Sequence, residues 1–250
     1  MEKILTCIMD IGEQMLISGA EICRVESSLR RMCKAMGAKR AEVFSITSCI
    51  ITTVYTEDGS SYTQTRRINT TGTDIEKIHI LNQLSRKICM EKPSLEEIRK
   101  DLEAAQRCKT YPFWLERLCY ALIAGSFTLF FGGGWQDALI SLLIGLLASF
   151  VVYASEKIVT NKIFSKFLTS FVATLLAYIA LFIGWTDAVD TIIIGNIMSL
   201  IPGIGLTTAI RDLFTGDSIT GLLRTIEAVI ITLAITAGYF LVAIFGGSVL

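Results

Sequence analysis

The sequence predicts an α-helical polytopic membrane protein with five transmembrane helices, preceded by a small α+β cytoplasmic domain. The 250 residues are 52% hydrophobic with a mean hydropathy of +0.57, which is too apolar for an ordinary soluble protein. The charges are also unevenly placed, because residues 1–117 hold 18 of the 23 Lys and Arg and 16 of the 23 Asp and Glu. We therefore expect a cytoplasmic domain over residues 1–110 and a five-helix transmembrane domain over residues 111–250.

The first part of the chain alternates between helical and strand-like patterns. Apolar side chains recur at steps of three and four over residues 4–36, which predicts one long helix. Gly12 and Gly19 lie inside this pattern and mark either close packing or a break. Two later segments, Thr73-x-x-Glu76 and Ser94-x-x-Glu97, fit the capping box and predict two further helices.

Between these helices, β-rich runs predict a short sheet that ends in a hairpin. The dipeptide Asp58-Gly59 is a strong signal for a two-residue hairpin loop, which would pair Ile51 with Arg66. The neighbouring Arg66 and Arg67 leave two interpretations open. They could grip an anion, or they could be solvated charges on an exposed strand.

Five apolar segments follow, each near the roughly 20 residues needed to cross the hydrocarbon core. They cover residues 117–134, 137–155, 167–185, 190–210 and 222–246. Lys and Arg occur before the first segment, between the second and third, and between the fourth and fifth, and in none of the other connections. By the positive-inside rule, the N-terminal domain is cytoplasmic and the C-terminus lies outside, which predicts a multi-pass protein of the cell (inner) membrane.

The fourth segment, "GNIMSLIPGIGLTTAIRDLF", contains residues that break or polarise a helix. Pro202 removes a backbone donor, and a break of this kind survives in a membrane only against protein or a wet cavity. Transporters often bind solutes at such interrupted helices. The spacing would place Asn196, Ser199 and Gly203 on one helical face. The alternative is a simple proline kink whose hydroxyls bond back to their own helix.

Charged residues flank the break on its predicted cytoplasmic side. Arg211 and Asp212 close the fourth segment, and Arg224 and Glu227 open the fifth on one helical face. Charges inside a membrane are costly and mark function or pairing, although Glu227 also fits the membrane interface. At 1.5 Å per residue, the break would lie about 13 Å deeper than Arg211, near the middle of the bilayer.

Four motifs resemble the bacterial threonine/serine exporter family. They are "SGAEICRVESSLRRMCKAMGA", "VFSITSCIITTV", "TQTRRI" and "IPGIGLTTAIRDLFTGDSITGLLRTIEA", and the last is the most specific. The resemblance implies secondary export of small amino acids or, in some members, of a dicarboxylate such as succinate. The chain looks like the larger half of a split pair, whose partner is a smaller membrane protein with the remaining spans. The matched positions are Pro202, Gly203, Thr207, Arg211, Asp212, Gly216, Asp217, Gly221 and Glu227.

The first functional hypothesis is an exporter subunit driven by the proton gradient. A substrate carboxylate would meet Arg211, Arg224 or the half-helix that follows Gly205, and Asp212 or Glu227 would carry the proton. The predicted substrate-binding residues are Asn196, Ser199, Pro202, Gly203, Gly205, Thr207, Thr208, Arg211 and Arg224.

The second hypothesis is a membrane-anchored sensor or enzyme that works through residues 1–107. The enzyme form is disfavoured, since the sequence shows no Ser-His-Asp order, no phosphate loop and no metal-ligand spacing. His79 is the single histidine and fits a structural or surface role, so we expect neither a metal nor another cofactor. The net charge of zero says nothing about nucleic acid, but no basic patch stands out, so we expect no nucleic-acid partner. A homo-oligomer is compatible with either hypothesis.

Overall fold

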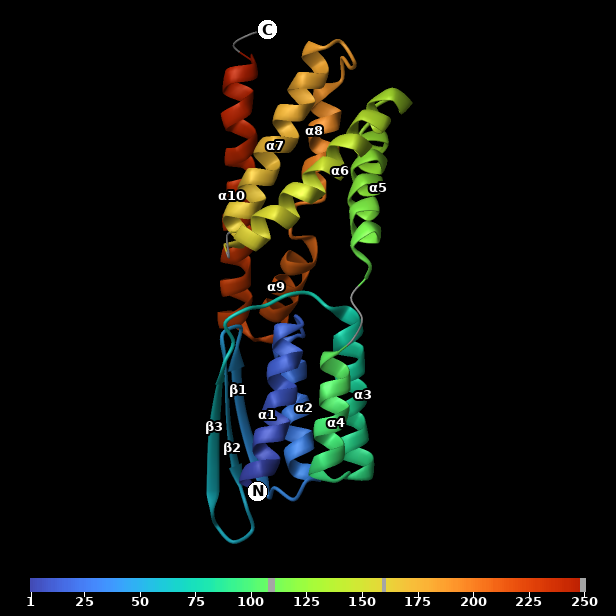
Figure 1. Cartoon of the computed structure of the whole chain (residues 1–250). Coiled ribbons are helices and arrows are strands. Elements are labelled where there is room, and N and C mark those ends of the chain that lie inside the picture. Colours follow the sequence, from blue (N-terminus) through green and yellow to red (C-terminus); the bar gives the residue numbers. More distant parts are fainter. Residues whose placement is uncertain (108–110, 159–160, 248–250) are drawn as a thin grey trace. The chain divides into compact units, whose positions relative to one another are not determined.

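The computed structural model describes residues 1–107, 111–158 and 161–247, which form helices and one three-stranded sheet (Figure 1). Contacts divide the chain into two compact units. The first unit comprises Met1–Lys109 with Leu206–Thr225, and the second comprises Thr110–Gly205 with Ile226–Leu250. A stretch at the predicted junction of the fourth and fifth spans therefore belongs with the N-terminal part of the chain.

The predicted long N-terminal helix is wrong, because the chain forms two helices there, α1 (Glu2–Ile17) and α2 (Ile22–Ala35). The break lies at Gly19, whose φ of +89° is in the left-handed region that favours glycine. Gly12 marks close packing instead. A Cβ at Gly12 would lie 2.8 Å from a methyl carbon of Leu29, so this glycine lets α2 approach α1.

The sheet is antiparallel in the order β1-β2-β3, with strands β1 (Arg40–Ile46), β2 (Cys49–Tyr55) and β3 (Ser61–Arg67). The hairpin forms, but its predicted register is wrong by one residue, since Ile51 pairs with Thr65. The loop has three residues, closed by the bond from Thr56 N to Ser60 O at 2.9 Å, and Gly59 takes its left-handed position with φ +84°. A shift of one residue exchanges the two faces of a strand.

Two further helices, α3 (Ile75–Glu91) and α4 (Leu95–Gln106), complete the sequence-continuous part of the first unit. The capping box at Ser94 and Glu97 is confirmed. The box expected at Thr73 is wrong, because the carboxylate of Asp74 accepts a hydrogen bond from the Lys77 amide and begins the helix one residue later. Figure 1 shows α1 and α2 between the sheet and the pair α3 and α4, so the core lies on both sides of the first helices.

Four helices are long and apolar enough to cross a membrane. They are α5 (Phe113–Phe130), α6 (Trp135–Ile158), α7 (Lys162–Phe182) and α10 (Ser218–Gly247). The pair α8 (Val189–Met198) and α9 (Gly203–Thr215) passes the same test together but is bent by 56°. The described residues thus contain four candidate spans, or five if the bent pair forms one.

In the second unit, α8 packs against α5, α6 and α7. Small and branched side chains fill the contact, among them Ala177 and Ile192, which are fully buried. Large apolar side chains of α5, α6, α7 and α10 remain exposed on the outside, as expected for helices that face lipid. Helix α8 therefore contacts three of the four candidate spans.

Candidate functional site

The predicted break in the fourth hydrophobic segment is confirmed. Helix α8 ends at Met198, and α9 begins at Gly203 directly after Pro202. Proline has no amide hydrogen for the helical ladder and tolerates the start of a helix far better than its interior. The Gly203 amide donates to Ile201 O at 2.8 Å, which makes a tight local turn.

Asn196, on the last turn of α8, sits in a buried polar network of the second unit. Its Nδ2 donates to Ser141 Oγ at 2.9 Å and to Ile192 O at 3.0 Å. Thr128 Oγ1 donates to the same serine oxygen at 2.7 Å. The network therefore links α8, α6 and α5, while Asn196 Oδ1 is buried without a hydrogen-bond partner in the described part of the chain. Sequence reasoning missed Thr128 and Ser141, because single hydroxyls inside apolar segments carry no pattern.

Glycines allow the helices to close around this network. A Cβ at Gly195 would lie 2.8 Å from Ala124 O and 2.9 Å from Thr128 N, both on the backbone of α5. A Cβ at Gly145 would lie 2.7 Å from the Ala124 side chain and 3.3 Å from Asn196 Oδ1. Small residues of this kind let helices in lipid approach each other closely, as their positions inside the predicted spans indicate.

The expectation that Asn196, Ser199 and Gly203 share one helical face fails at Gly203. It assumed a continuous helix, whereas α8 ends with Ser199 as its cap and the chain bends by 56° into α9, which begins at Gly203. Ser199 instead caps the end of α8, where its Oγ donates to Asn196 O at 2.8 Å. The remaining residues predicted around the break are Pro202, which is half-buried, Gly203, Gly205 and Thr207, which are exposed, and Thr208, which is half-buried.

The charged residues beyond the break form a second cluster, inside the first unit. Arg224 Nη1 lies 3.0 Å from Asp212 Oδ2, and its Nη2 donates to Ala20 O at 3.3 Å. This ion pair is buried, with side-chain exposures of 15% for Arg224 and 1% for Asp212. Arg211 Nη1 contacts Glu21 Oε1 at 2.6 Å and remains 58% exposed. Arg211 and Asp212, which are adjacent in the sequence, therefore pair with different residues.

A glycine and a turn bring the two halves of this cluster together. Gly216 adopts φ +94° between α9 and α10, and the Asp217 amide donates to Asp212 O at 3.0 Å. A Cβ at Gly221 would lie 2.8 Å from Leu213 N and 2.9 Å from Ala209 O, both on the backbone of α9. The close contact of α9 and α10 at Gly221 therefore places Arg224 beside Asp212.

The cluster has more negative than positive charge. Three carboxylates (Glu21, Asp212, Asp217) face two guanidinium groups (Arg211, Arg224), and each carboxylate has one buried oxygen that receives no hydrogen bond from the described residues. The contact of Asp212 Oδ2 with Arg224 is thus an ion pair that lacks hydrogen-bond alignment. An arrangement of this kind can accept a proton or an ammonium group. Sequence reasoning missed Glu21 as a member, since it lies about 190 residues away in the chain.

Glu227 does not join this cluster. It belongs to the second unit and is exposed on α10, and no ion pair of its carboxylate occurs within residues 1–107, 111–158 and 161–247. Its predicted neighbour on the helix, Arg224, is paired with Asp212. The predicted site residues thus fall into two groups, one around Asn196 and the other around Asp212.

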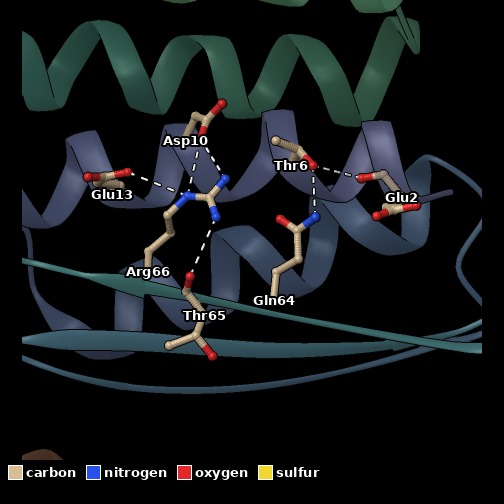
Figure 2. A network of polar contacts seen from close by, with 7 residues as sticks. All are labelled: Glu2, Thr6, Asp10, Glu13, Gln64, Thr65 and Arg66. Carbon is tan, nitrogen blue, oxygen red and sulfur yellow. Dashed lines mark hydrogen bonds and ion pairs between the residues drawn. The ribbon is translucent and has the colours of Figure 1, made fainter.

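The arginine pair of β3 is not an anion site at Arg66. Figure 2 shows the guanidinium of Arg66 directed at α1, where its Nη2 lies 3.0 Å from Asp10 Oδ1 and its Nε lies 3.6 Å from Glu13 Oε2. Beside it, Gln64 Nε2 donates to Thr6 Oγ1 at 2.8 Å. The shifted register turns these residues inward, so Arg66 fastens the sheet to α1, while Arg67 stays exposed.

No group of three or more His, Cys, Asp or Glu residues suited to a metal ion occurs in the described ranges. Apolar helices packed on glycines and a hydrophobic segment broken at a proline indicate a multi-pass membrane transport protein. Comparison with known families agrees with this class. The chain belongs to the threonine/serine exporter family ThrE, whose family model matches residues 6–246.

Named relatives fall into a short and a long type. The chain is 27% identical to a probable succinate transporter subunit, YjjP of Escherichia coli, over 91% of this chain and 88% of that protein. It is 26% identical to the threonine/serine exporter of Corynebacterium glutamicum over 91% of this chain, and 24% identical to a probable threonine/serine exporter of Mycobacterium tuberculosis over 94%. The chain spans only 48% and 45% of these two proteins. No solved structure matches it.

Proposed function

We propose that this chain is the larger subunit of a two-protein secondary exporter in the cell (inner) membrane. Its substrate would be a small amino acid such as threonine or serine, or a dicarboxylate such as succinate. The family membership supports export, and the names of the relatives supply these two substrate classes. The relatives carry transporter names, which also favours transport over the alternative of a membrane-anchored enzyme.

A difference in length supports the proposed partner. The chain covers most of a relative named as a subunit but only about half of the relatives named as exporters. The missing half would come from a smaller membrane protein of the same family. The charge pattern between the hydrophobic segments further favours a cytoplasmic N-terminal unit and an outer C-terminus.

The observation that carries the proposed transport role is the break at Pro202 next to the buried amide of Asn196. An interrupted helix with unsatisfied polar atoms is costly in a membrane unless it serves a solute. We assign binding of polar substrate groups to Asn196, Ser199 and the residues that open α9. For the substrate carboxylate, Arg211 is the more accessible cation, because Arg224 is committed to Asp212 and Ala20.

Two carboxylates are proposed to couple transport to protons. Asp212 is almost fully buried in a cluster with excess negative charge, so a proton there would compete with Arg224 for the same carboxylate. Glu227 is exposed on α10 and would exchange protons with its surroundings more readily. Either residue could take up a proton as the substrate leaves.

The test is efflux of threonine, serine and succinate from loaded cells that express the chain with its smaller partner. Export should require both proteins. Arg211→Ala should slow it by about tenfold or more, as expected when one charge-assisted contact of about 1.4 kcal/mol is lost. Glu227→Gln should also slow it, because glutamine cannot take up a proton. Arg67→Ala is the matched control, since Arg67 is an exposed arginine outside both groups, and it should export at the wild-type rate.

Two results would contradict the proposal at different levels. If Arg211→Ala and Glu227→Gln both export at the wild-type rate, the assignment of site residues is wrong while the export function stands. If no loaded solute leaves the cells when both proteins are present in the membrane, the export function itself is wrong. If the Pro202→Ala variant exports at the wild-type rate together with its partner, the helix break has no role in transport.

A further inference from the structure

A cavity lies between α2 and α3 in the first unit, away from the residues assigned to transport. It has a volume of about 540 Å³, within the range of small-molecule sites. On α2 it is lined by Arg24, Ser28 and Arg31, which recur at steps of four and three along one face of the helix. The cavity is therefore built into the contact of two regular helices.

The wall supplied by α3 continues this polar character. His79, Asn82, Gln83 and Arg86 line the cavity and follow the same helical spacing. The two serines of the site, Ser28 and Ser85, are buried at 3% and 5% exposure. Hydroxyl and amide groups at these positions can donate hydrogen bonds to a ligand while the apolar faces of both helices stay in the core.

The three arginines of the cavity have no counter-charge. Within the residues that the structure describes, Arg24, Arg31 and Arg86 form no ion pair, and no Asp or Glu lines the cavity. The acidic residues nearest on this part of the chain are engaged elsewhere: Glu21, which precedes α2, pairs with Arg211, and Glu26 of α2 accepts from the Ser45 amide at 2.7 Å. This contrasts with Arg66, which two carboxylates of α1 neutralise.

The remaining titratable groups leave the positive charge in place. Burial raises the pKa of the Cys89 thiol, which outweighs the opposite effect of Arg31, so this side chain stays neutral at physiological pH. His79 shares a hydrogen bond with Gln83 at 2.9 Å and adds no negative charge to the cavity. Arg31 Nε donates to Ser27 O at 3.2 Å, but none of the three guanidinium groups has an anionic partner in the described residues. Together with several neutral donors they are complementary to an anion with more than one charged oxygen group.

We propose that the α2–α3 cavity binds a compact multivalent oxyanion, a small molecule with two or more carboxylate or phosphate groups. Binding at this site would let the concentration of an anionic metabolite regulate the exporter from its N-terminal unit. The regulatory consequence rests on the proposed function, whereas binding itself does not, because binding is measured on the purified protein without transport.

The experiment is isothermal titration calorimetry on the purified full-length chain, with pyrophosphate and citrate as probes. Sodium chloride at matched ionic strength separates site binding from general screening. At least one probe should bind with a single saturable site. The double substitution Arg31→Gln and Arg86→Gln should weaken it by about a hundredfold, because each charge-assisted hydrogen bond contributes about a factor of ten.

Arg30→Gln is the matched control, since Arg30 neighbours Arg31 on α2 but does not line the cavity. It should keep the affinity within about twofold, as expected for a charge that does not touch the ligand. The proposal is overturned if neither probe binds above the chloride control, or if binding survives the double substitution. It is equally overturned if only vesicles with anionic lipid bind through these arginines, because the ligand would then be a membrane surface.

Discussion

The polar groups around Asn196 in the second unit and around Asp212 in the first unit find their hydrogen-bond and ion-pair partners in different ways. Around Asn196, neutral side chains of three helices hydrogen-bond to one another and to the backbone at glycine-lined contacts. Around Asp212, charged side chains of α9 and α10 are balanced partly by Glu21 and Ala20, which precede α2. The neutral group takes its hydrogen-bond partners from its own helix packing, which leaves Asn196 Oδ1 without one in the described residues, whereas the charges take partners from a distant part of the chain.

This difference gives the two groups different sensitivities. A buried ion pair that loses one partner leaves an uncompensated charge, which costs more than one lost hydrogen bond between neutral groups. A neutral network depends instead on how closely its helices can approach. Substitution of a buried charge should therefore lower the free energy of unfolding most, and loss of a single hydroxyl should lower it least.

The largest effect is expected at the buried ion pair. Arg224→Gln should lower the free energy of unfolding by about 3 kcal/mol, because it leaves the Asp212 carboxylate buried without a cation. The double variant Arg224→Gln and Asp212→Asn should recover most of this loss. Arg211→Gln is the control, since its partly exposed pair should cost about 1 kcal/mol or less. Detergent-induced unfolding followed by tryptophan fluorescence measures each change, and equal losses at Arg224 and Arg211 would refute the distinction.

A smaller effect is expected at the helix contact that encloses the neutral network. Gly195→Ala should cost about 1–3 kcal/mol, because the new Cβ would overlap backbone atoms of α5 that cannot give way as a flexible side chain can. Gly203→Ala is the matched control on the other side of the break, where a Cβ meets nothing within 4 Å. The same unfolding measurement applies. An unchanged stability of Gly195→Ala would show that α5 and α8 are not in close contact.

The smallest effect is expected from the network's central hydroxyl. Ser141→Ala removes the shared partner of Thr128 and Asn196 and should cost about 1 kcal/mol, typical of hydrogen bonds between membrane helices. Ser199→Ala serves as the comparison, since that hydroxyl donates to Asn196 O at the end of the same helix and does not link two helices. A loss at Ser141 as large as that at Arg224 would overturn the proposed difference between neutral and charged groups.

Several features could be predicted because they depend on neighbouring residues. The break at Pro202, the capping box at Ser94 and the exposed outer faces of the long helices follow from local sequence and hydrophobicity. Two of the errors were also local, because the correct and the predicted hairpin loop, and the correct and the predicted helix cap, differ by one residue. Gly59 favoured a three-residue hairpin loop over the two-residue loop, and Asp74 competed with Thr73 for the helix cap.

By itself, the sequence determined the class of protein, the presence of several candidate spans and the position of the helix break. These properties follow from composition, from hydrophobic length and from the chemistry of proline, which act wherever the chain folds. Only the tertiary structure decided which charges meet: Asp212 with Arg224, Arg211 with Glu21, and Arg66 with two carboxylates of α1. It also left three arginines unpaired around one cavity. Ion pairs and cavities join residues far apart in the chain, so only packing selects them from many alternatives with similar local sequence.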